Sequence, residues 1–244
     1  AGGIYGKITA VTDQTVTLEI APKIKIKVLK SAVTQVVAQA ADTAGNADLA
    51  LIKYDTLGNL LFEKIVEKSS GEVSGELKAN YGNGVYVMGW ARDKNDTNRI
   101  FICEYAASGE SIGGRTYCDP KLHFRGLQWA RGAKGGFLAG GVWTDVKDLF
   151  FIRFDSLGGF QSLTRFENPE AEISLTGIET GDRGDVIMTA VSAGAGTGDD
   201  YLTVAFGADG RPRWARRYDG PAHKDDLPRA LTVDESSNIY VTGA

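Results

Sequence analysis

The side chains best suited to hold a metal ion lie in a short polar segment around residue 95. Asp93, Asn95 and Asp96 offer oxygen atoms, and calcium in proteins takes about six to eight oxygen ligands. The segment lacks the glycine and the terminal glutamate of the common calcium loop, and Asp and Asn often cap turns instead. We therefore expect no metal centre and no other cofactor, with these three residues as the candidates should calcium bind.

The sequence contains no recognisable catalytic motif. The two histidines, His123 and His223, have no cysteine or glutamate at the spacing of a zinc site, so we expect them to be surface residues. No G-x-S-x-G motif for a serine nucleophile is present. The loop Gly194-x-Gly196-x-Gly198 lacks the Lys-Ser/Thr pair of a phosphate-binding loop, so we expect it to be a loop that connects two blades.

A basic cluster surrounds Trp214. Arg213 and Arg216 flank it closely, with Arg211 and Arg217 beside them. One interpretation is the solvated face of an outer strand, with Trp214 packed between sheets. The other is a patch that binds an acidic glycan or a partner protein, which makes Trp214, Arg213 and Arg216 the binding candidates.

The strands that would position these residues recur about every fifty residues. A turn closes at Gly58, Gly109, Gly158 and Gly210, and an apolar strand begins at residues 84, 135, 184 and 238. A repeat of this length with four short strands is typical of a β-propeller. We predict an all-β, propeller-like array of about four four-stranded antiparallel blades, in units of residues ~41–95, 96–147, 148–198 and 199–244.

The last repeat is the clearest copy. Its strands are expected at residues 201–206, 213–218, 229–233 and 238–243, and we expect them to form one meander. The stretch YLTVAFGADGRPRWARRYDGP…DDLPRALTVDESSNIYVTG resembles the bacterial SBBP β-propeller repeat, less closely matched in the earlier copies. The resemblance implies a propeller over residues 34–244, and it implies no catalytic residues because the shared positions are turn and core positions.

The first 33 residues do not follow the repeat. Residues 4–11, 15–21 and 24–29 predict a short β-meander, in which isoleucine and valine alternate with lysine. The pattern from Gly2 to Val33 resembles the soluble part of YajC, an accessory subunit of the bacterial Sec translocase. We expect residues 1–33 to be a separate domain. The alternative is a short additional blade that they form together with residues 34–40.

Composition limits the partners. The net charge is −4, so we expect no nucleic-acid partner. No apolar run approaches the roughly 20 residues of a membrane span. The two cysteines, Cys103 and Cys118, are expected to be out of register across a hairpin, which favours two free buried thiols over a disulfide.

The expected function is a non-catalytic binding or scaffold module of the bacterial cell envelope that contacts protein or glycan, in which a second copy of the chain could complete the ring. One alternative is a carbohydrate-active enzyme with paired carboxylates in a central channel. Another is a designed or spliced fusion without a function of its own. The expected location is periplasmic or exported, and membrane-associated if the YajC resemblance holds.

Overall fold

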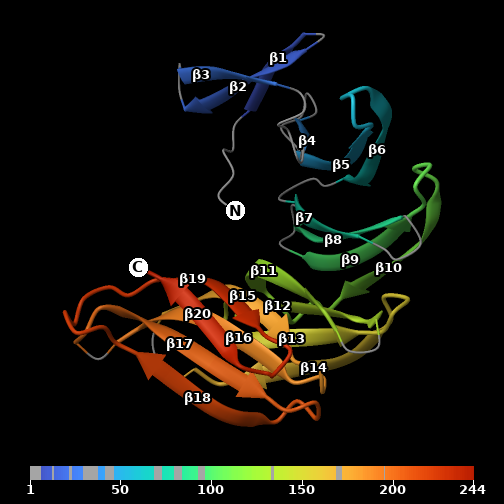
Figure 1. Cartoon of the computed structure of the whole chain (residues 1–244). Helices are drawn as coiled ribbons and strands as arrows, with labels where there is room; N and C mark the ends of the chain where they lie inside the picture. The colour runs from blue at the N-terminus through green and yellow to red at the C-terminus, as the bar shows by residue number, and fades with distance from the viewer. Residues whose placement is uncertain are drawn as a thin grey trace.

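The computed structural model describes residues 7–12, 14–21, 24–29, 38–41, 47–68, 73–79, 84–92, 97–132, 135–168, 172–194 and 196–244. All secondary-structure elements in these residues are β-strands. The strands form antiparallel sheets that follow one another along a curve (Figure 1). The prediction of an all-β, propeller-like array is confirmed. The described residues contain no helix with the length and apolar character needed to cross a bilayer.

Three of the sheets have four strands, in the order of the chain. The first contains β7 (Val73–Ala79), β8 (Val85–Arg92), β9 (Asn98–Tyr105) and β10 (Ser111–Cys118). The second contains β11 (Phe124–Arg131), β12 (Phe137–Trp143), β13 (Asp148–Phe154) and β14 (Phe160–Phe166). The third contains β15 (Ile173–Thr180), β16 (Val186–Ala193), β17 (Asp199–Phe206) and β18 (Pro212–Tyr218).

Three smaller sheets complete the described chain. One contains β4 (Ala38–Ala41), β5 (Ala47–Tyr54) and β6 (Leu60–Lys68), and another pairs β19 (Pro228–Val233) with β20 (Ile239–Gly243). The predicted N-terminal meander is a sheet of β1 (Lys7–Val11), β2 (Thr15–Ala21) and β3 (Ile24–Leu29). In this sheet Val16 is buried and Lys27 is exposed, which agrees with one apolar buried face and one solvent-exposed face.

The blade and the sequence repeat are out of phase. All four strands expected after residue 199 are present, but they do not form one meander as predicted. Strands β17 and β18 are the outer half of one sheet, and β19 and β20 are the inner half of the next. A blade therefore begins at the third strand of the sequence unit, and the chain crosses between sheets at residues 219–227.

The core lies between neighbouring sheets and is made by their middle strands. Strands β12 and β13 are buried along almost their whole length, whereas β10 and β18 at the outer edge are mostly exposed. The largest core cluster joins the second and third four-stranded sheets through Phe151, Met188 and Phe206. Each large apolar side chain buried in this way contributes about 1.5–3 kcal/mol, so face-to-face stacking stabilises the array.

Candidate functional site

A repeated contact joins each four-stranded sheet to the sheet before it. The turn between the third and fourth strands of one sheet lies against the outer strand of the preceding sheet. A Cβ atom at Gly109 would lie 2.8 Å from the Phe62 ring, one at Gly158 would lie 3.3 Å from Arg115, and one at Gly210 would lie 2.9 Å from Thr164. All three glycines have φ between 78° and 84°, so both the turn and the close approach require glycine. We call this contact the inter-sheet joint.

Aromatic side chains accompany the joint. Tyr117 at the end of β10 lies 6.2 Å from Phe154 of the next sheet, and Phe166 at the end of β14 lies 6.0 Å from Phe206, both edge-to-face. At the first joint, Phe62 packs against a cluster that includes Tyr105. Such pairs add about 0.5–1.5 kcal/mol beyond the area they bury.

Among the residues that the structure describes, none covers the equivalent face of β18 in this way. Strand pairing makes Arg216 equivalent to Thr164, and Tyr218 equivalent to Phe166. Tyr218 is 56% exposed, and its ring lies beside that of Tyr201 in its own sheet, with the two centroids 5.5 Å apart. Together, Trp214, Arg216 and Tyr218 form what we call the open face.

The structure separates the predicted binding residues. Ala215 packs against the core, so its alternating neighbours Trp214 and Arg216 lie on the other side of β18, which is the open face. Trp214 is half-buried and Arg216 is exposed. Arg213 points elsewhere and donates to Asp185 across 3.1 Å. A role of these residues in binding stays a prediction, and the structure places two of the three on one surface.

The other half of a joint is exposed on the β4–β6 sheet. Tyr54 occupies the position that Tyr105, Phe154 and Phe206 occupy in the later sheets, where those side chains are buried. Tyr54 is 42% exposed. Its turn ends at Gly58 with φ of 83°. The described chain thus carries an uncovered face at one end and an uncovered turn with its aromatic residue at the other.

The remaining sequence candidates do not converge on a catalytic centre in the described residues. Asp93, Asn95 and Asp96 lie outside the described residues. His123 is paired with Asp145 at 2.9 Å, and His223 with Asp219 at 2.6 Å. The Asp219 carboxylate raises the pKa of His223 because it accepts a hydrogen bond from the imidazolium.

The glycine-rich loop connects β16 to β17 within one sheet, so the prediction that it joins two blades is wrong. The backbone N–H of Gly194 donates to Gly198 O at 2.6 Å, and Gly196 has a φ of 95°. The hydroxyl of Thr197 in this loop lies 2.9 Å from Asp200 Oδ2. The loop therefore contributes to the surroundings of Asp200.

The cysteines are free and out of register. Cys103 pairs across the ladder with Gly114, and Cys118 pairs with Arg99. This confirms the register argument against a disulfide, but the expectation that both thiols are buried is wrong, because Cys118 at the end of the outer strand β10 is exposed. Burial raises the pKa of the Cys103 thiol, which makes it a poor nucleophile at neutral pH.

Two carboxylates, Glu172 and Asp199, line a shallow open pocket beside Arg125 and Val191. Lys147 Nζ lies 2.6 Å from Glu172 Oε1 and lowers the pKa of that carboxyl through the hydrogen bond and its charge. A carboxyl held ionised in this way is unsuited to donate a proton as a general acid.

The structure also brings together three aspartates that the sequence reading did not connect. One oxygen each of Asp200, Asp219 and Asp226 lie within 4.8 Å of one another. The signal in the sequence was the density of aspartate around residues 199–200, 219 and 225–226. The way β18 returns to β19 could not be read from it.

A family model of YajC, a preprotein translocase subunit, matches residues 1–37. The YajC-like segment predicted for residues 2–33 is therefore confirmed. No SBBP family model matches, so that resemblance stays a prediction. No curated protein sequence matches the chain.

Several solved structures have similar folds. A complex of KlAtg21 with the coiled-coil of AgAtg16 is 12% identical with a TM-score of 0.50, and the match covers 98% of this chain and 64% of that one. A Bacteroides caccae protein of unknown function is 13% identical with a TM-score of 0.48, covering 84% of this chain and 63% of that one. A gluconolactonase from Xanthomonas campestris is 11% identical with a TM-score of 0.43, covering 95% and 76%.

The likeness to the KlAtg21 complex concerns the fold only, and it agrees with the propeller-like β fold described above. This chain spans 63–64% of the length of the first two structures.

Proposed function

We propose that this chain is a non-catalytic scaffold module of the bacterial cell envelope that binds another protein through the open face of β18. The partner that fits this face is a second copy of the chain. The envelope location rests on the match of residues 1–37 to a preprotein translocase subunit.

The observation that carries the proposal is the joint itself. The contact recurs three times inside the chain, each time with a glycine turn lying on an outer strand. The open face has the outer-strand half of this joint, and Tyr54 with the Gly58 turn has the other half. A second copy can therefore place its Tyr54 turn on the open face by the same packing that already joins the internal sheets.

The chemistry of the open face also fits a protein contact. Trp, Tyr and Arg are the residues most enriched where interfaces bind tightly, and the open face contains one of each. Tyr218 and Arg216 are exposed, so burying them requires no rearrangement of the core.

Two blocked variants test the proposal. Tyr218→Asp places a charge on the open face, and Tyr54→Asp places one on the turn. Each variant alone should sediment as a monomer, because each half of the joint needs the other. Mixing the two should restore a complex of two chains, since one copy retains the face and the other retains the turn.

Phe160→Asp is the matched control, because Phe160 is also a large exposed aromatic residue, 49% accessible, but stacks on Tyr117 within the chain. It should not change the association of copies. A mixture that stays monomeric while the wild type associates would contradict the head-to-tail joint.

A further inference from the structure

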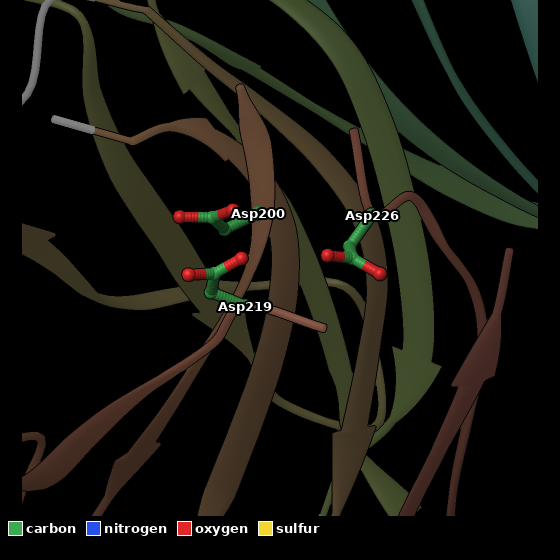
Figure 2. A group of neighbouring side chains, drawn as sticks. All are labelled: Asp200, Asp219 and Asp226. Carbon is green, nitrogen blue, oxygen red and sulfur yellow. The ribbon is translucent and has the colours of Figure 1, made fainter. Parts of the chain in front are cut away.

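We infer that Asp200, Asp219 and Asp226 form a binding site for a calcium ion at the crossing from the third four-stranded sheet to the β19–β20 sheet. Figure 2 shows Asp226 approaching from one side and Asp200 and Asp219 from the other. Asp200 lies near the start of β17, Asp219 directly follows β18, and Asp226 is two residues before β19.

The distances fit one shared ion. Calcium binds carboxylate oxygens at about 2.3–2.6 Å, so two ligands on opposite sides of it lie about 4.6–5.2 Å apart. One oxygen from each of the three carboxylates lies within 4.8 Å of the others. A single ion can therefore touch all three without moving the backbone.

An unpaired buried oxygen is a second, independent observation that favours a cation site here. The Asp200 side chain is 0% exposed, and its Oδ1 has no hydrogen-bond partner among the described residues. Asp219 Oδ1 is also buried and has none. A buried carboxylate oxygen without a donor is strongly unfavourable unless a cation or an ordered water binds it, and two such oxygens beside a third carboxylate favour the cation.

The Oδ2 atom of each of these carboxylates is hydrogen-bonded within the protein. Asp200 Oδ2 accepts hydrogen bonds from Thr197 and Arg217, and Asp219 Oδ2 is paired with His223. Asp226 Oδ2 accepts a hydrogen bond from the Gly220 N–H at 2.7 Å. These contacts fix the orientation of each carboxylate.

Charge supports a divalent cation. Three carboxylates face one another, while Arg217 and His223 are the cationic side chains paired with them. The repulsion between carboxylates this close is unfavourable, and a cation bound between them offsets it. Oxygen-only ligands are typical of calcium, whereas magnesium demands a tighter octahedral site.

Preceding repeats provide a matched control. Strand pairing places Asp148 at the position equivalent to Asp200, but there Arg165 and the Asn168 N–H occupy both carboxylate oxygens. Glu167 occupies the position equivalent to Asp219, and Ile173 the position equivalent to Asp226. The earlier repeat therefore has the buried aspartate without the site.

Calcium added to the EDTA-treated full chain tests the inference. At about a hundredfold excess over the dissociation constant, calcium should raise the melting temperature by roughly 5–10 °C. Asp226→Asn, in a loop at the surface, should abolish this rise while leaving the melting temperature in EDTA within a few degrees of the wild type.

Asp148→Asn should lower the melting temperature equally with and without calcium and keep the full calcium-dependent rise. Calorimetric titration with calcium chloride should show one ion per chain for the wild type and for Asp148→Asn, and none for Asp226→Asn. The inference is overturned if calcium leaves the wild-type melting temperature unchanged, if Asp226→Asn retains the rise, or if magnesium at the same concentration gives an equal rise.

Discussion

The second and third four-stranded sheets are built alike, yet they differ at two equivalent places. In the β11–β14 sheet, Phe166 is covered by Phe206 of the next sheet, and both carboxylate oxygens of Asp148 are hydrogen-bonded. In the β15–β18 sheet, Tyr218 is exposed and one oxygen of Asp200 has no partner among the described residues. The repeat thus keeps the fold, and the departures from it are the places that we propose for a partner chain and an ion.

The largest difference in stability is expected between substitutions at the two equivalent aromatic positions, Phe166 and Tyr218. Phe166→Ala should lower the free energy of unfolding by about 3 kcal/mol, because it removes a ring packed between two sheets. Tyr218→Ala should lower it by less than about 0.5 kcal/mol in dilute solution, where the open face is solvated. Urea titrations of both variants measure the contrast, and equal losses would mean that the open face is covered within the chain.

The second difference in stability concerns the two aspartates. Asp148→Asn should lower the free energy of unfolding by about 1–3 kcal/mol, because the new amide NH₂ group faces a donor, either the Arg165 side chain or the Asn168 N–H. Asp200→Asn should cost less than this in EDTA, since it removes one of three mutually repelling charges. Thermal unfolding of both variants in EDTA compares them, and a larger cost at Asp200 would show that the cluster is stable without a cation.

A smaller effect is expected from pH. The pKa of His223 is raised in the folded chain by its hydrogen bond and charge interaction with Asp219. Its contribution to stability is therefore fully present below the unfolded pKa of about 6.5 and is lost as the pH rises through the folded value.

His223→Gln should remove this loss of stability over the pH window that begins at about 6.5 and extends upward. Unfolding should be followed in EDTA, so that calcium does not compete for Asp219. A wild-type stability that rises over this window, or a variant that behaves like the wild type, would contradict the pairing.

The sequence could predict much of the fold because the local signals agree. Runs such as Tyr201–Phe206 combine β-branched and aromatic residues, and the turns at Gly158 and Gly210 need positive φ. The phase of the blades could not be predicted, because a repeating pattern marks no starting strand. Which strands share a sheet depends on the crossing at residues 219–227, where the chain returns from the outer edge to the inner one.

The sites were harder to predict than the fold for a related reason. Trp214 and Arg216 could be selected as a candidate surface from their types and alternation on one strand. Asp200, Asp219 and Asp226 come from three segments that meet only after β18 has paired with β17 and the chain has returned to β19. Register fixes that meeting, and residue types alone do not reveal it.

The mass of the wild-type chain in solution, measured across a concentration series, tests the central claim most directly. The exposed turn at Tyr54 and the open face at Trp214, Arg216 and Tyr218 predict a mass that rises with concentration to multiples of 26.1 kDa. A mass that stays at that of one chain at every concentration would contradict the account.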